Sequence, residues 1–228
     1  MTGQEHQARD KKNTATRFVF LLVALAVLLV GYPYFQNNQF GAFLGGLVSL
    51  ALLISSAYAV RAQKWAVIVA SGLALLTASA SIMAFIKGIR GHPLVEASFF
   101  LFYAFSTIVI FLEVIKSTRI TAETIYGVVC VYLLIGVTFG TLYDLIETLE
   151  PESFRINVPV EGDSKIGWRH LIFFSFMTLT SIGYGDITPA TFQSQSLASI
   201  EGVIGVMYVA VLIARMVSIH SQTPQNLD

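Results

Sequence analysis

The chain has 228 residues, of which 55% are hydrophobic and 12% are charged, with 14 basic and 14 acidic side chains. An average globular chain carries about 25% charged residues, so this composition excludes a soluble enzyme. The lack of a basic excess argues against a nucleic-acid-binding protein, and the mean hydropathy of +0.70 excludes a disordered chain. The single cysteine, Cys130, excludes an intrachain disulfide framework and a cysteine-based metal cluster. The composition therefore predicts an integral membrane protein.

Membrane-spanning helices need about 20 mostly apolar residues. Six segments meet this requirement: Phe18–Phe35, Gly41–Val60, Trp65–Lys87, Leu94–Ile115, Ala122–Ile146 and Gln195–Ile219. Between the last two, the chain is polar at first, becomes apolar over Ile166–Leu179 and then becomes rich in Gly and Pro. This apolar part is too short to span, so we expect it to be re-entrant and surrounded by protein or water. The expected fold class is an all-α integral membrane protein with six transmembrane helices and a re-entrant segment between helices five and six.

The distribution of Lys and Arg predicts the orientation in the membrane. With the N-terminus inside, nine of these residues fall in inner segments: Arg9, Lys11, Lys12, Arg17, Arg61, Lys64, Lys116, Arg119 and Arg215. Five fall in outer segments: Lys87, Arg90, Arg155, Lys165 and Arg169. We therefore expect both termini to be cytoplasmic and the first span to be an uncleaved signal anchor. The tails, residues 1–17 and 220–228, are too short to bury a core, so no cytoplasmic domain is expected.

Residues 178–189 read Thr-Leu-Thr-Ser-Ile-Gly-Tyr-Gly-Asp-Ile-Thr-Pro. This run resembles the selectivity filter of potassium channels, for which TVGYG is the familiar sequence. The equivalent residues here are Ser181–Gly185, which we call the filter segment. Backbone carbonyls can replace the water of a dehydrated K⁺ when successive residues turn their oxygens inward. This requires backbone conformations that alternate between right-handed and left-handed. Gly183 and Gly185 can adopt the positive φ of a left-handed conformation without a Cβ penalty.

The resemblance implies a role for each residue of this region. K⁺ would be held by the backbone carbonyls of Ser181, Ile182, Gly183 and Tyr184. The hydroxyl of Ser181 would also contribute. Support for the filter segment would come from Thr178, Thr180 and Asp186. The side chains of Ile182 and Tyr184 would point away from the conduction axis and pack against a pore helix at roughly Trp168–Thr180.

The resemblance also implies the architecture and the partners. One chain supplies one filter strand, so the channel would be a homotetramer. Residues 18–120 would form a peripheral region of four helices, and residues 121–219 would form the pore domain with its outer helix, pore helix, filter and inner helix. We expect K⁺ and the lipid bilayer as partners, together with an unidentified gating partner. We expect no cofactor, no nucleic acid and no enzymatic activity, and a location in the plasma membrane, by analogy the inner membrane of a prokaryote.

Two residues depart from the family pattern. The family usually has Thr at the position of Ser181, and serine keeps the oxygen but loses the methyl group. Many family members carry a pore-helix Trp that bonds the Asp after the filter, whereas this chain has Phe173, so Asp186 must find another partner or face water. These differences bear on K⁺ over Na⁺ selectivity and on inactivation.

Three features of the helices have competing interpretations. Glu201, inside the sixth span, is either a buried neutral carboxyl bonded to hydroxyls such as those of Ser175 or Thr178, or a charge near the permeation path. Gly205 lies 16 residues after Pro189. It is either a gating hinge of the inner helix, as the resemblance implies, or a site of close helix packing. The small-residue pair Gly136 and Gly140 predicts a helix contact.

A voltage sensor needs an Arg-rich helix with about 3–4 gating charges. Leu94–Ile115 contains no Lys or Arg, so we predict a K⁺ channel without steep voltage dependence. Two alternatives stay open, a weakly selective cation channel and a non-conducting regulatory subunit. A K⁺ transporter subunit is disfavoured, because such proteins carry four degenerate filter repeats in one chain.

Overall fold

The computed structural model of the protein describes residues 18–31, 39–59, 64–87, 92–117, 121–158 and 166–221. The described helices are Phe18–Gly31, α2 (Gln39–Ala59), α3 (Lys64–Lys87), α4 (Pro93–Lys116), α5 (Ala122–Leu149), α6 (Trp168–Leu179) and α7 (Phe192–Ser221). Two short strands, β1 (Phe154–Ile156) and β2 (Ile187–Pro189), pair in antiparallel orientation. The predicted tail at residues 1–17, and residues 222–228 of the other tail, lie outside the described residues.

Local sequence signals fix the starts of the two central helices. The ring atom Nδ1 of His92 accepts the backbone N–H of Leu94 at 3.3 Å, and Pro93 occupies the first helical position of α4. Proline suits that position because its missing N–H would have had no partner there. Oγ1 of Thr121 accepts the N–H of Thr124 at 3.3 Å and caps α5.

Four of the described helices are long and apolar enough to cross a membrane: Trp65–Met83, Pro93–Lys116, Ala122–Leu149 and Phe192–Arg215. The apolar stretches Phe18–Gly31 and Ser49–Ala59 are shorter within the described residues. The structure thus bears out an all-helical protein with membrane-spanning helices, whereas the count of six spans stays a prediction.

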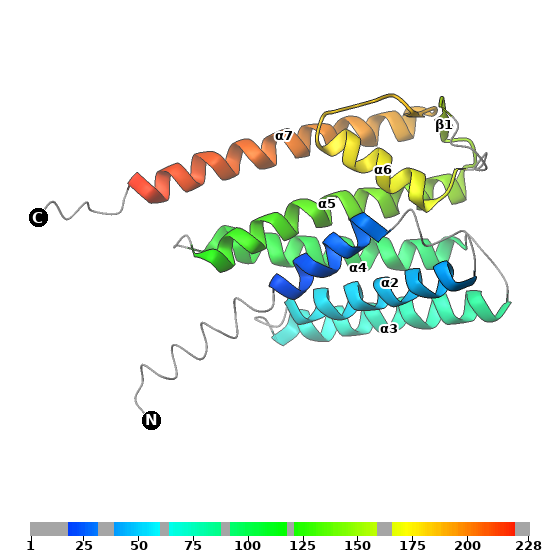
Figure 1. The fold of residues 1–228 in the computed structure, drawn as a ribbon, viewed down its shortest axis with the longest axis horizontal. Coiled ribbons are helices and arrows are strands. Elements are labelled where there is room, and N and C mark those ends of the chain that lie inside the picture. Colours follow the sequence, from blue (N-terminus) through cyan, green and yellow to red (C-terminus); the bar gives the residue numbers. More distant parts are fainter. Residues whose placement is uncertain are drawn as a thin grey trace, which may run out of the picture.

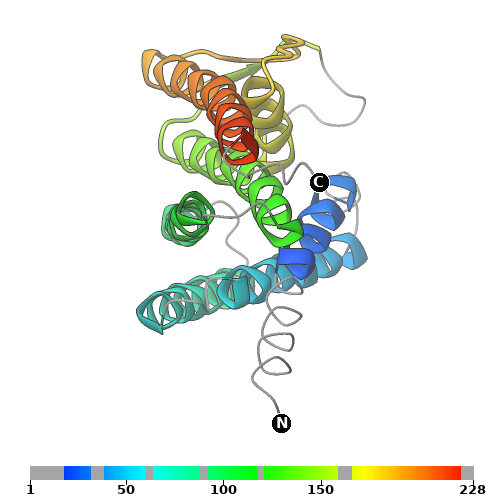
Figure 2. The same ribbon diagram turned by 90° about the vertical axis from the view of Figure 1, so that its left-hand side faces the viewer.

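The helices are arranged around α5. α4 packs along α5, while α6 contacts both α5 and α7. Viewed along the helices, α6 and α7 lie on one side of α5, and the N-terminal helix, α2 and α3 lie on the other (Figure 2). We call the end of the bundle that holds β1 and β2 the strand end. α6 starts at the strand end and runs into the bundle, and the chain after it returns to the strand end, where α7 begins (Figure 1).

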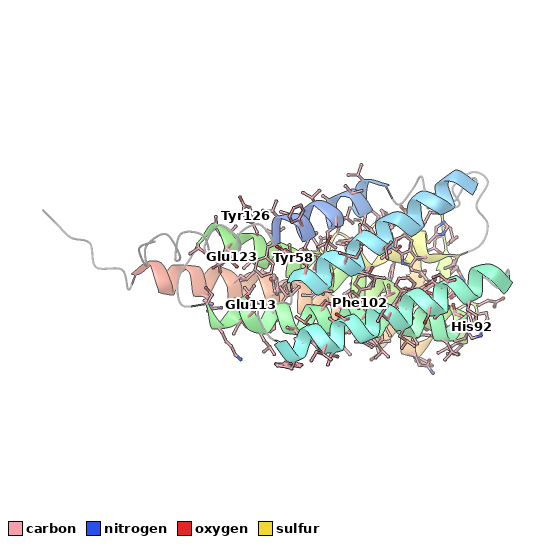
Figure 3. All side chains as sticks on the ribbon, turned by 90° about the horizontal axis from the view of Figure 1, so that it is seen from below. Tyr58, His92, Phe102, Glu113, Glu123 and Tyr126 are labelled. Atoms are coloured by element: carbon pink, nitrogen blue, oxygen red, sulfur yellow. The ribbon has the colours of Figure 1, made fainter. Side chains whose placement is uncertain are left out.

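Two apolar clusters stabilise this arrangement. The larger one joins the N-terminal helix and α2–α5 and also includes Leu179 of α6 and Tyr208 of α7. The ring of Phe102 in α4 lies within it, fully buried. Figure 3 places Phe102 midway along α4, with His92 near one end and Glu113 near the other. The smaller cluster lies at the strand end and consists of Tyr143, Phe154, Leu171, Phe174 and Ile187. This second cluster connects α5, β1, α6 and β2, and so it supports the segment that resembles a filter.

Candidate functional site

The short helix α6 packs closely against α5 at two glycines, Gly136 and Gly140, for which the sequence predicted a helix contact. A Cβ on Gly136 would lie 2.6 Å from Cε1 of Phe176, and a Cβ on Gly140 would lie 2.4 Å from Cδ1 of Ile172. Real Cβ atoms do not approach other atoms so closely. The two glycines therefore let α5 and α6 come into close contact. The observed bounds of α6, Trp168–Leu179, agree with the pore helix predicted at Trp168–Thr180.

The backbone of the filter segment alternates in handedness. φ is +58° at Ser181, +58° at Gly183 and +81° at Gly185, whereas the intervening Ile182 and Tyr184 have negative φ. The two glycines adopt the left-handed conformations that the sequence predicted. The left-handed conformation of Ser181 was not foreseen, because a residue with a Cβ rarely adopts it.

The N–H groups at the start of the filter segment turn back to α6. Ser181 donates to the carbonyl of Thr178 at 3.0 Å, and Ile182 and Gly183 donate to the carbonyl of Met177 at 3.0 and 3.1 Å. By contrast, the carbonyl oxygens of Ser181, Ile182, Gly183 and Tyr184 receive no hydrogen bond from any described residue. Four successive carbonyl oxygens without a donor, in a segment that is exposed within one chain, constitute a candidate cation site.

The side chains of Ile182 and Tyr184 are only partly covered within one chain. Ile182 is 51% exposed and Tyr184 is 67% exposed. One chain alone therefore does not provide the packing that we predicted for them. Of the predicted supporting residues, Thr180 donates its hydroxyl to the carbonyl of Phe176 at 2.6 Å. For Thr178 the contact is the backbone bond already described, and its supporting role stays a prediction.

After the filter segment, β1 holds the chain in place. The backbone N–H of Asn157 donates to the carbonyl of Asp186 at 2.7 Å, and its side-chain Nδ2 donates to the carbonyl of Gly185 at 2.8 Å. Asp186 thus has a partner through its main chain, whereas Phe173, at the expected Trp position, has no side-chain N–H to offer. Sequence reasoning missed Asn157, since nothing in a polar loop residue marks it as a partner of the filter segment.

Glu201 is completely buried in a polar contact between three helices. The hydroxyl of Tyr143 on α5 donates to its Oε2 at 2.6 Å, and Oγ of Ser175 on α6 lies 2.5 Å from its Oε1. The predicted bond to Ser175 is confirmed. Thr178 makes no hydrogen bond to Glu201 among the described residues, and the bond from Tyr143 was not predicted. Ser175 Oγ also lies 2.7 Å from the carbonyl of Gly136. A hydroxyl has one proton, so when Ser175 donates it to Gly136, the contact with Glu201 is satisfied only by a protonated carboxyl.

Gly205 is in close contact with the end of α6. A Cβ there would lie 2.0 Å from the carbonyl oxygen and 2.9 Å from the carbonyl carbon of Leu179. The helix α7 continues through Gly205 without interruption. The close-packing interpretation is therefore supported by a direct contact, and the hinge stays a prediction. At Gly202, one turn earlier, a Cβ would have an ordinary contact at 3.9 Å from the carbonyl of Thr178.

Comparison with known protein families agrees with this geometry. Residues 127–222, which include α6, the filter segment and α7, match a family described as ion channel. No curated protein and no solved structure gives a significant match to the chain. The matched region contains Glu201, Gly205 and the filter segment.

Proposed function

We propose that the protein is the subunit of a tetrameric K⁺ channel that conducts passively through its filter segment. The observation that carries this proposal is the run of four successive carbonyls, from Ser181 to Tyr184, that no donor among the described residues reaches. The alternating φ values of this run allow successive carbonyls to face one axis. Carbonyl oxygens in such a ring replace the hydration shell of K⁺.

The path of α6 and the filter segment supports the same function. The chain enters the bundle from the strand end and returns to that end (Figure 1). If α4, α5 and α7 cross the bilayer, this path makes α6 a re-entrant pore helix. Backbone carbonyls that lack partners are tolerated at membrane depth where they line a water-filled path.

The exposed apolar surface supports assembly from identical copies. Ile182 and Tyr184 are largely exposed in one chain, and α7 exposes a series of apolar side chains: Ile200, Val203, Val206, Met207, Val209, Val211 and Ile213. A tetramer would bury part of this surface and would place four filter segments around one axis. We propose that the strand end is extracellular and that both termini are cytoplasmic, in a plasma membrane.

The test is a K⁺ flux measurement on purified protein in liposomes, followed by the reversal potential with K⁺ on one side and Na⁺ on the other. We expect a K⁺-selective current that Ba²⁺ blocks and that Gly183→Ala abolishes, because Ala at φ +58° is strained. Gly72→Ala is the matched control, because its Cβ also enters open space but on a regular helix. A reversal potential near zero would identify a weakly selective cation channel, for which Ser181 is the candidate cause. Tetramers without any current would identify a regulatory subunit instead.

A further inference from the structure

The last carbonyl of the filter segment differs from the four before it. Asn157 Nδ2 donates one hydrogen bond to the carbonyl of Gly185 at 2.8 Å and another to Oγ1 of Thr188 at 3.1 Å. A carboxamide has two N–H donors, and both are used here. The Asn157 side chain thus joins the end of the filter segment to the strand that follows it.

The pairing of β1 with β2 determines which residue reaches Gly185. Phe154 lies opposite Pro189 and Ile156 lies opposite Ile187. The next residue, Asn157, therefore comes opposite Asp186, and its N–H donates to the Asp186 carbonyl at 2.7 Å. A shift of one residue in this register would turn the amide side chain to the other face of the ribbon.

The ribbon itself is anchored to α5 and α6. The carboxylate of Glu147 accepts the N–H groups of Glu152 at 3.0 Å and of Phe154 at 3.1 Å. The rings of Tyr143, Phe154 and Phe174 form a closed set of edge contacts, with centroid distances of 5.2, 5.2 and 5.4 Å. Aromatic edge contacts of this kind add to the stability that burial alone gives. Asn157 therefore projects from a ribbon that α5 and α6 hold in place.

We propose that Asn157 is a positioning residue that fixes the orientation of the Gly185 carbonyl and thereby keeps the filter segment in its conducting shape. The proposal rests on the K⁺ channel function proposed above. It assigns to Asn157, the residue that follows β1, a role for which α6 offers no side-chain N–H donor at Phe173. A carbonyl that loses this donor can rotate, and rotation at the last carbonyl disturbs the cation site next to it.

The experiment compares three variants of the full-length protein in planar bilayers. Asn157→Leu keeps the size of the side chain and removes both donors. Asn157→Gln keeps an amide and tests whether a longer amide side chain preserves the wild-type behaviour. Thr188→Val is the matched control, because it removes the second hydrogen bond and leaves the bond to Gly185 intact. The first readout is the rate at which the K⁺ current declines at a low K⁺ concentration on the outer side. The second is the K⁺ concentration at which the unfolding temperature of the purified protein has risen by half of its maximal increase.

For Asn157→Leu we expect the current to decline about fivefold faster and the half-maximal K⁺ concentration to rise about fivefold, as befits one exposed hydrogen bond. High outer K⁺ should slow the decline, because a bound ion supports the filter segment. Asn157→Gln should be intermediate and Thr188→Val should match the wild type. If Asn157→Leu matches the wild type in both readouts, or if Thr188→Val changes them equally, the proposal is wrong. A wild-type protein with neither K⁺ current nor stabilisation by K⁺ would instead overturn the channel function itself.

Discussion

The α5–α7 region and the helix α3 differ in how their hydroxyl side chains are bonded. In the α5–α7 region, three tyrosine hydroxyls bond to other helices: Tyr143 to Glu201, Tyr132 to the Leu179 carbonyl, and Tyr208 to the Val128 carbonyl. In α3 the hydroxyls return to their own helix: Thr77 to Leu73, Ser79 to Leu76 and Ser81 to Thr77. The first region is thus fixed by directional bonds between elements, and α3 relies on apolar packing.

The physical reason is the membrane environment. Lipid tails are as apolar as leucine, so apolar side chains gain little from burial between helices, and polar bonds and close packing decide the geometry. Exposed apolar residues on α3, such as Ile68 and Leu75 at 74% and 71% exposure, can therefore face lipid without cost. The filter segment needs a defined geometry, and the polar bonds are concentrated around it.

The largest effect is expected from filling the contact between α7 and α6. Gly205→Ala places a Cβ 2.0 Å from the carbonyl oxygen of Leu179, two residues before the filter segment. Backbone atoms cannot move aside as side chains do, so we expect a loss of about 3 kcal/mol in stability and loss of K⁺ flux. Thermal unfolding of the purified protein measures the first effect, and liposome flux measures the second.

Gly202→Ala is the control for this substitution. It adds the same methyl group to α7, but at 3.9 Å from the nearest atom. We expect wild-type stability and flux. If Gly205→Ala instead leaves stability unchanged and alters only the fraction of time the channel is open, the hinge interpretation of Gly205 holds and the packing interpretation is wrong.

The next largest effect concerns Glu201. Glu201→Ala leaves a cavity and removes the partner of the Tyr143 and Ser175 hydroxyls, so we expect a loss of about 2–3 kcal/mol. In Glu201→Gln the amide can donate to Ser175 and accept from Tyr143, as a protonated carboxyl does. We therefore expect stability within about 1 kcal/mol of the wild type and an unchanged single-channel conductance. A clear change of conductance in Glu201→Gln would show that a charge at Glu201 acts on the permeating ion.

A smaller effect is expected from Tyr143→Phe. This substitution removes the hydroxyl that bonds Glu201 and keeps the ring that contacts Phe154 and Phe174. One hydrogen bond contributes about 1 kcal/mol, so the unfolding temperature should fall modestly. Tyr143→Leu also removes the ring contacts, so its unfolding temperature should fall further. Equal effects of the two substitutions would mean that the hydroxyl, and not the ring set, is what stabilises the strand end.

Local signals explain how much of the site could be predicted. The bounds of α6, the positive φ of Gly183 and Gly185, and the contact between Glu201 and Ser175 all follow from residue type or from position on a helix. A glycine in an alternating backbone and a carboxyl inside an apolar helix are informative without knowledge of the fold.

The remaining features depend on contacts between distant residues. β1 and β2 have three residues each, which is too short for a period-two pattern to be recognised. Tyr143 lies on a helix with apolar residues on every face, so its sequence does not indicate which face meets α7. Asn157 acquires its role only because the register of the two strands brings it to Gly185.

The smallest effect is expected when the membrane voltage is changed. A charge that crosses the whole membrane field gains about 2.3 kcal/mol per 100 mV, and steep gating needs several such charges in each subunit. α4 carries only Glu96 and Glu113 between Leu94 and Ile115, each near an end of the helix. We therefore expect the open probability to change little between −100 and +100 mV, on the scale of that energy per charge. Current that rises steeply on depolarisation would contradict this. It would also show that the helices before α5 move during opening, against the passive role that their apolar packing indicates.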